Sequence, residues 1–234
     1  RLGASAAARN VVQRIPLHAR YEFVRAGTGN KQEIMRFALD HFLATEPHCQ
    51  ALGITRANGY DFVDAIVTKC LQYEDYCLRI LDRETDKLIG MRLMTVMSRG
   101  VPYDNGHNEN TTENERMFTA ILDKLKADFW RLQPDANKVL LREITCIHPD
   151  HQRQGIAQFI VHLGLDFDRL RASGIDGIMS EASSIANQNL LAKNGYRELA
   201  RSDRNQYVRS DGSSVVFHDD TKSIKLFYLN INEF

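Results

Sequence analysis

One segment of the chain combines residue types and spacing suited to binding a phosphate group. An apolar run over residues 139–147 is typical of a buried strand, and a helical pattern begins near Gly155. Between them, the motif Gln152-x-x-Gly155-x-Ala157 leaves room for the backbone to approach a ligand. Successive N–H groups at the start of a helix form an anion-binding site, which we call the anion cradle. Pyrophosphate is the anion that such a site suits best. Spacing alone leaves open whether this is a phosphate site or an ordinary strand-to-helix turn.

Other reactive side chains indicate chemistry less clearly. Cys146 lies on the apolar run and is expected to be a core residue, whereas His148 and His151 lie in the loop beside the cradle. His107 has no partner at metal-ligand spacing, and none of the four cysteines falls in a CxxC pair. The motif also lacks the Gly-Lys-Ser/Thr of a Walker loop and the GxGxxG dinucleotide fingerprint. We therefore expect no metal site.

The elements that must position this segment alternate between strands and helices. Apolar residues recur at helical spacing in several stretches, and two apolar arms flank the polar turn over residues 82–87. The predicted strands span residues 19–25, 77–81, 88–97, 139–147, 175–182, 197–201 and 223–230. The predicted helices span residues 31 to a break at 45–47, then 60–71, 113–132, 156–173 and 186–193.

The order of these elements predicts a single α/β domain. Early strands pair as hairpins, and the later strand-helix-strand crossover requires a parallel pair, so the sheet should be mixed. The arm over residues 88–97 is apolar almost throughout, as expected of an inner strand. A polar loop over residues 100–112 is long enough to be either a substrate-facing segment or a solvated connector.

Composition excludes several classes of protein. The chain has 234 residues, of which 43% are hydrophobic and 26% charged, as in a globular protein rather than a disordered or fibrous one. Lys plus Arg and Asp plus Glu both number 30, so the formal net charge is +0 and no chain-wide basic footprint for nucleic acid exists. No apolar run approaches the roughly 18 residues of a membrane span. We expect neither nucleic acid nor a membrane among its partners.

The first residues differ from the rest of the chain. Before Glu22 there is no acidic residue, while four arginines recur among Ala and Ser. This composition is typical of an organelle transit peptide, and an ordinary N-terminal extension has it too. We assign residues 1–17 to such an extension and residues 18–234 to one domain. The scattered cysteines indicate reduced thiols and hence a cytoplasmic location, and nothing in the sequence indicates the oligomeric state.

The strand-turn-helix segment resembles the acetyl-CoA-binding motif of the GNAT N-acetyltransferase superfamily, whose pattern is Arg/Gln-x-x-Gly-x-Gly/Ala. Residues 147–149 (Ile-His-Pro) and 194–196 (Asn-Gly-Tyr) resemble the family's flanking positions. The resemblance implies an α/β GNAT fold, with one mixed central sheet flanked by helices and splayed to admit acetyl-CoA. It also implies that backbone groups of the strand pair with pantetheine and that N–H groups of the turn hold the pyrophosphate. The residues expected to hold acetyl-CoA are Thr145, Cys146, Ile147, Arg153, Gln154, Gly155, Ile156, Ala157 and Gln158.

A narrower resemblance lies near the N-terminus. Residues 42–53, FLATEPHCQALG, resemble the Glu-Pro-Leu…Leu-Gly segment of insect-type arylalkylamine N-acetyltransferases, and residues 215–227 resemble their tail. Members of that family acetylate dopamine, serotonin, octopamine and tyramine, so the resemblance implies a small arylalkylamine as acceptor. His48 stands where the pattern has Leu, which implies a different acceptor preference.

The same resemblance places the general base at Glu46, in the Glu-Pro segment. An alkylammonium has a pKa near the ~10.4 of lysine, so it must lose a proton before it attacks a thioester. Glu143 is the second candidate, because protein-acetylating members place their base four residues before the position of Ile147. The alternative for Glu46 is a surface residue before a proline. The alternative for Glu143 is a carboxylate paired with a cation such as Arg142.

On the thiolate side, the chain departs from the superfamily. Many members carry a Tyr general acid four residues before the closing glycine, and here that position holds Leu191. The departure resembles the insect-type enzymes, in which small polar residues on this helix have assigned roles. By spacing from Gly195, those roles fall on Ser183 and Asn187, with Ser184 adjacent. Helix capping or solvent contact is the alternative for each.

The sequence thus predicts an N-acetyltransferase that transfers acetyl from acetyl-CoA to the primary amine of small arylalkylamines. Transfer would occur by direct attack in a ternary complex, without a metal. Two alternatives stay open. One is an acetyltransferase of protein lysine or another amine, and the other is a CoA-binding module without catalysis, which the missing Tyr would suit.

Overall fold

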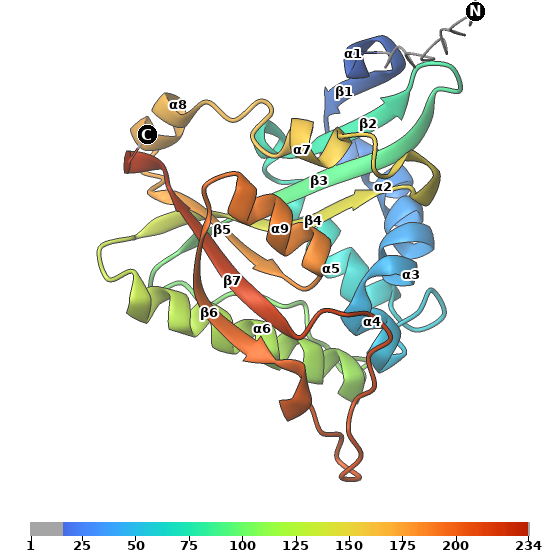
Figure 1. Ribbon diagram of the computed structural model, residues 1–234, viewed down its shortest axis with the longest axis vertical. Helices are drawn as coiled ribbons and strands as arrows, with labels where there is room; N and C mark the ends of the chain where they lie inside the picture. The colour runs from blue at the N-terminus through green and yellow to red at the C-terminus, as the bar shows by residue number, and fades with distance from the viewer. Residues whose placement is uncertain (1–15, 234) are drawn as a thin grey trace, which may run out of the picture.

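A seven-stranded sheet organises the part of the chain that the computed structural model describes, residues 16–233 (Figure 1). The strand order is β1-β2-β3-β4-β5-β7-β6, in which β4 and β5 run parallel and the other neighbours pair antiparallel. The sheet is therefore mixed, as predicted. Nearly all of the expected extension over residues 1–17 lies outside the described residues. The strands are β1 (Tyr21–Arg25), β2 (Leu78–Asp82), β3 (Lys87–Ser98), β4 (Lys138–Ile147), β5 (Gly177–Ala182), β6 (Arg197–Asp203) and β7 (Ser223–Asn230).

Helices cover both faces of the sheet. α2, α5 and α6 pack on one face around a large apolar cluster, and α7, α8 and α9 pack on the other around two smaller clusters (Figure 1). We name these the α5/α6 face and the α7/α9 face. None of the helices within residues 16–233 has the length and apolar character needed to cross a membrane. The helices are α1 (Leu17–Arg20), α2 (Lys31–Phe37), α3 (Leu43–Thr45), α4 (Pro47–Leu52), α5 (Tyr60–Cys70), α6 (Glu113–Leu132), α7 (Ile156–Ile160), α8 (Phe167–Ala172) and α9 (Ile185–Lys193), with a π-helical turn over Ala38–Phe42.

β4 and β5 part in the middle of the sheet. Within the described residues, their pairing ends at Arg142 opposite Ser180. Beyond that pair, β4 continues to Ile147 along β3, and β5 continues to Ala182 along β7. We call this parting the fork. The splay expected from the resemblance is therefore present, and it leaves one edge of β4 without a neighbouring strand.

A β-bulge in β4 lies at the fork. The pairing register with β3 shifts between Arg142 and Ile144, so Glu143 is the extra residue. Arg142 faces the α7/α9 side, where its guanidinium donates a hydrogen bond to the carbonyl of Val161 (2.8 Å). Glu143 faces the α5/α6 side, beside Lys69. The side chains of these two neighbouring residues thus point to opposite faces of the sheet.

The prediction of one helix over residues 156–173 is wrong. α7 ends at Ile160, and α8 begins only at Phe167. The buried guanidinium of Arg92 donates hydrogen bonds to the carbonyls of Ile160 (2.6 Å) and Leu163 (2.9 Å), and Arg142 takes a third carbonyl of this stretch. In a continuous helix these carbonyls would accept N–H groups four residues later. Side chains from the sheet therefore replace the bonds that the amphipathic pattern predicts.

Candidate active site

The turn between β4 and α7 leaves open space at the start of the helix. Gly155 adopts φ +88° directly before α7, and Arg153 has φ +59°, a conformation that is uncommon for residues other than glycine. A Cβ placed on Gly155 would meet no atom within 4 Å. The space beside the first N–H groups of α7 is thus free for a ligand. This geometry fits a bulky anion such as pyrophosphate.

Side chains of the turn hold it in place against the sheet. The Gln154 Oε1 atom accepts hydrogen bonds from the Tyr21 hydroxyl (2.7 Å) and from Arg20 (2.9 Å). Gln152 donates to the carbonyl of Ile147 (2.9 Å). The side chain of Gln154 is therefore used to hold the turn. The predicted contact of Gln154 with acetyl-CoA would be made by its backbone N–H group.

The other predicted donor residues follow the edge of β4 and the start of α7. Thr145 and Cys146 lie on the part of β4 that has no β5 partner. Ile156 is buried in the apolar cluster beneath α7. Gln158 exchanges two hydrogen bonds with Asn194 (2.7 and 3.1 Å), which joins α7 to the end of α9. The free edge of β4 and the open turn form one continuous track.

The structure supports the core interpretation of Cys146, which is buried. Burial raises the pKa of the Cys146 thiol to about 12, so it is not a thiolate at neutral pH. Nε2 of His107 hydrogen-bonds the hydroxyl of Thr119 (2.8 Å). Within residues 16–233, no cluster of His, Cys, Asp and Glu side chains is arranged to hold a metal ion.

Glu46 is the single residue between α3 and α4. Its Oε2 accepts the N–H of Cys49 (2.5 Å) and so caps α4, which begins at Pro47. The side chain is buried, which rules out the surface alternative. The Oε1 atom lies 3.4 Å from Nδ1 of His48 and makes no well-aligned hydrogen bond within the described residues. One carboxylate oxygen therefore holds the helix, and the other is available to a ligand.

The surroundings of Glu46 keep it ionised. Burial raises its pKa, but the approach of His48, the Ser183 hydroxyl and the N–H of Cys49 outweigh burial, and the net pKa lies below the usual value. The His48 ring is itself fully buried and stacks on Phe118 at 5.2 Å. The structure thus brings together Glu46 and Ser183, which lie far apart in the sequence.

The start of α9 gives its polar residues different surroundings. Ser184 is the N-cap, because its Oγ accepts the N–H of Asn187 (3.3 Å). Ser183 is therefore not needed as a cap. The Oδ1 atom of Asn187 is buried and has no hydrogen-bond partner in the described part of the chain. Leu191 is fully buried and offers no proton.

Glu143 is buried at the bulge on the α5/α6 face. Its Oε1 lies 3.7 Å from Nζ of Lys69. Burial raises its pKa to about 7, with Lys69 opposing the rise and Glu181 adding to it. The alternative interpretation of Glu143, a carboxylate paired with a cation, fits the structure. The cation is Lys69 rather than Arg142, because consecutive side chains of a strand point to opposite faces. A carboxyl with a pKa near neutrality suits proton transfer, although this one already has a cationic partner.

A second buried ion pair on this face escaped the sequence analysis. Nζ of Lys126 lies 3.0 Å from Glu181, and the two side chains are only 6% and 5% exposed. Lys69 and Lys126 both place Nζ over the ring of Tyr103, at 3.6 and 4.7 Å from its centroid. The polar loop over residues 100–112 is thereby anchored to this face through Tyr103. The one signal in the sequence was Glu181, a charged residue in a predicted strand that also carries the apolar residues Ile178 and Met179.

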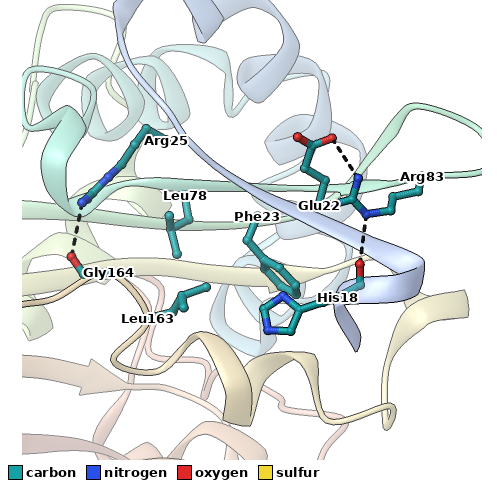
Figure 2. Close-up of a pocket in the computed structure, with 8 residues that line it drawn as sticks. All are labelled: His18, Glu22, Phe23, Arg25, Leu78, Arg83, Leu163 and Gly164. Carbon is teal, nitrogen blue, oxygen red and sulfur yellow. Dashed lines mark hydrogen bonds and ion pairs between the residues drawn. The ribbon is translucent and has the colours of Figure 1, made fainter. Parts of the chain in front are cut away.

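A surface pocket of about 380 Å³ is lined mainly by residues of β1, β2 and the segment between α7 and α8 (Figure 2). Its charged groups are already engaged. Arg25 donates to the carbonyl of Gly164 (3.3 Å), and Glu22 lies 3.8 Å from Arg83. None of the residues that line it is a predicted site residue, so we do not include it in the candidate active site.

Comparison with known proteins gives a clear result for the fold alone. No family model matches the sequence, and neither does any curated protein. The structure is similar to arylalkylamine N-acetyltransferase 2 from Aedes aegypti, with a TM-score of 0.76 and 14% identity over 91% of this chain and 99% of that one. It is similar to the polyamine N-acetyltransferase of Drosophila melanogaster that forms N-acetylagmatine (TM-score 0.62, 12% identity, 90% and 99% covered). The C-terminal condensation domain of Ebony, in complex with β-alanyl-dopamine, is also similar (TM-score 0.67, 18% identity, 90% and 99% covered).

These similarities establish the class of fold. The chain has the fold of the GNAT acetyltransferases, and the resemblance to insect arylalkylamine N-acetyltransferases is confirmed at the level of the fold. Identities of 10–18% across the similar structures are too low to carry a substrate from one protein to another.

Proposed function

We propose that this protein is an N-acetyltransferase that transfers acetyl from acetyl-CoA to the primary amine of small arylalkylamines. The observation that carries the proposal is the fork between β4 and β5. The track along β4 begins at the open turn of Gly155 and ends at the fork. The buried carboxylate of Glu46, whose Oε1 atom has no well-aligned hydrogen bond, lies on the α5/α6 face. Two of the similar structures reported above are named as N-acetyltransferases, which supports the same reaction class.

The donor side would hold acetyl-CoA mainly through backbone groups. N–H groups of residues 153–158 bind the pyrophosphate, and Gly155 keeps the approach open. Backbone groups of residues 145–147 pair with the amides of pantetheine as an additional strand would, because β5 leaves this edge free. Gln152 releases the carbonyl of Ile147 when that pairing forms.

On the acceptor side, Glu46 takes a proton from the ammonium group. The neutral nitrogen then attacks the thioester carbonyl carbon, the C–N bond forms, and the C–S bond breaks with its electron pair on sulfur. Holding amine and thioester together in one ternary complex supplies much of the rate. Ser183 and Asn187 lie at the start of α9, where Ser183 orients the Glu46 carboxylate and the buried Asn187 oxygen accepts a hydrogen bond from the amine. Glu143 is the second candidate for the base.

The charges on the α5/α6 face support an arylalkylamine over a polyamine. A polyamine carries a second cation, which requires a second free carboxylate. Glu143 and Glu181 are each paired with a lysine, so neither is free for that purpose. Aromatic rings, by contrast, surround His48 next to Glu46: Phe118 at 5.2 Å and Phe217 at 4.8 Å between ring centroids. An aromatic amine matches these surroundings better.

A panel of acceptors tests the proposal with one measurement. The full chain is incubated with acetyl-CoA and with dopamine, serotonin, tyramine, octopamine, agmatine or a lysine peptide, and thiol release is followed. We expect the aromatic amines to have the highest kcat/KM. Preference for the peptide or for agmatine would contradict the substrate assignment. CoA binding by calorimetry without thiol release from any acceptor would mean a binding module.

A further inference from the structure

Two buried arginines lie together on the α7/α9 face at the fork. Arg92 of β3 is 0% exposed and Arg142 of β4 is 4% exposed. Burial and then the neighbouring Arg142 lower the pKa of Arg92 to about 9, which leaves it charged at neutral pH. Within residues 16–233, neither guanidinium forms an ion pair with a carboxylate, although many other arginines do. Uncompensated positive charge in the interior is costly, so the site favours an incoming anion.

Carbonyl partners satisfy only part of this cluster. Arg142 donates to the hydroxyl of Thr145 (3.1 Å), and both arginines donate to carbonyls of the α7–α8 link. Arg92 also donates to the carbonyl of Tyr76 (3.1 Å), but its buried Nε has no hydrogen-bond partner in the described chain. The buried hydroxyl of Tyr196 lies beside Arg142 and makes no well-aligned hydrogen bond within residues 16–233. The ring of His162 stacks on Tyr196 at 5.7 Å. The cluster therefore keeps unused donors as well as a surplus of positive charge.

Among residues 16–233, no group that faces the arginines supplies a negative charge at neutral pH. Burial raises the pKa of Cys77 to about 11 and also raises the pKa of Tyr196, so both keep their protons. Burial and then the two arginines lower the pKa of His162 to about 4, so its ring is neutral. Arg25 of β1 adds a further positive charge. The full charges of the described residues at this place are thus all positive, and only carbonyl dipoles oppose them.

The location of the cluster on the donor track identifies the anion. In the proposed function, pyrophosphate lies at the start of α7 and the pantetheine arm follows β4 from Ile147 toward the fork. Arg142 is the last β4 residue that pairs with β5, so it stands where the track ends. Five residues of extended strand span roughly 16 Å, a length that an extended pantetheine arm covers. The sulfur end of the donor therefore comes to Arg142.

We propose that the Arg92–Arg142 pair, with Tyr196, binds the thiolate that leaves the thioester. This inference rests on the proposed function. The arginine pair would stabilise the leaving thiolate, a role for which Leu191 offers no phenol. When the C–S bond breaks, Arg142 and the Tyr196 O–H stabilise the electron pair on sulfur without giving it a proton. The proton lost by the amine stays with Glu46 on the opposite face. The released thiolate takes its proton from water.

The experiment uses CoA itself as the probe and does not depend on turnover. The pKa of the bound CoA thiol is measured in the full chain from the ultraviolet absorbance of the thiolate, with binding checked by calorimetry. We expect the native protein to lower the thiol pKa by about 1–2 units relative to free CoA, as a cation within ~4–6 Å does. Arg142→Lys should retain most of the shift, and Arg142→Met should lose at least half of it.

A matched control separates this role from carbonyl capping. Arg99 donates to the carbonyls of Gln133 (2.7 Å) and Ala136 (2.7 Å) beyond α6, so Arg99→Met removes a capping arginine away from the fork. It should lower the melting temperature and leave the thiol pKa unchanged. If Arg142→Met does not fold, Tyr196→Phe, which removes one hydroxyl, should still raise the thiol pKa.

The outcomes distinguish the inference from the function on which it rests. If native protein binds CoA without lowering its thiol pKa, or if Arg142→Met and Arg99→Met behave alike, the arginines only cap carbonyls and the inference is wrong. If the native protein does not bind CoA at all, the proposed function fails, and the inference fails with it.

Discussion

The two faces of the sheet carry different kinds of buried charge at the fork. On the α5/α6 face, each buried carboxylate considered above lies beside a basic side chain. These pairs are Glu46–His48, Glu143–Lys69 and Glu181–Lys126. On the α7/α9 face, Arg92 and Arg142 are buried with carbonyls and hydroxyls but with no carboxylate in an ion pair among the described residues.

This difference matches the two halves of an acyl transfer to an amine. The acceptor side must remove a proton from a cation, and carboxylates do this. The donor side must accept an electron pair on sulfur, and cations favour that. Arg142 and Glu143 are neighbours in β4, and the alternation of side chains along a strand places one on each face. A single strand thereby supplies both kinds of environment within a short distance.

The largest expected effect is on the acceptor side. Glu46→Gln removes the charge but keeps an oxygen that can accept the N–H of Cys49, so α4 stays capped. If Glu46 is the base, kcat should fall by about 10²–10⁴ at neutral pH and recover toward high pH, where the free amine is abundant. Steady-state rates across pH measure this. Exposed Glu109→Gln is the control, and a loss in Glu143→Gln but not in Glu46→Gln would reverse the assignment of the base.

The next effect concerns donor binding. Gly155→Val places a side chain in the open space of the turn at a φ of +88°. Losing one or two hydrogen bonds to a charged phosphate should weaken acetyl-CoA binding by about tenfold to a hundredfold. Gly174→Val is the matched control, because Gly174 also has positive φ (+75°) and no neighbour within 4 Å. Equal affinity in the two variants, by calorimetry, would place the pyrophosphate elsewhere.

The ion pair at the bulge gives an effect on stability. Because the pKa of Glu143 is raised to about 7 in the fold, its protonated form stabilises the protein below about pH 4.5, and that contribution is lost as pH rises through 7. Glu143→Gln mimics the protonated form. The free energy of unfolding of the variant minus that of the native protein should therefore rise between pH 5 and pH 8, by on the order of 3 kcal/mol at most. A difference that does not change with pH in denaturant titrations would contradict the raised pKa.

The smallest effect is on the α7/α9 face. His162 has a pKa lowered to about 4, so the unfolded chain binds its proton first and stability falls as pH drops from 6.5 toward 4. His162→Gln should remove part of that fall, which corresponds to a melting temperature higher than native by about 2–4 °C near pH 4.5. Exposed His218→Gln is the control. A difference in melting temperature that is the same at pH 7 and at pH 4.5 would contradict the lowered pKa of His162.

The sequence predicted where the strands and most of the helices lie along the chain, because hydrophobic periodicity and turn residues are local. It also identified the turn at Gly155 and the Glu46 segment, since both are short contiguous motifs. The sequence could not predict which face each buried charge serves. The sequence left two interpretations of Glu143 open, a general base or a carboxylate paired with a cation, and only the fold shows that Lys69 of α5 lies beside it.

What the sequence by itself determined is the set of local elements and motifs: the mixed α/β order, the strand-turn-helix motif at Gly155 and the Glu-Pro segment at Glu46. Only the tertiary structure decided how these combine. The amphipathic pattern over residues 156–173 predicted one helix, but Arg92, distant in sequence, supplied hydrogen bonds to its carbonyls and split it into α7 and α8. Likewise, Glu46 and Ser183 meet only because the chain folds one against the other. Charges and hydrogen-bond donors act through space, so their partners depend on packing rather than on their neighbours along the chain.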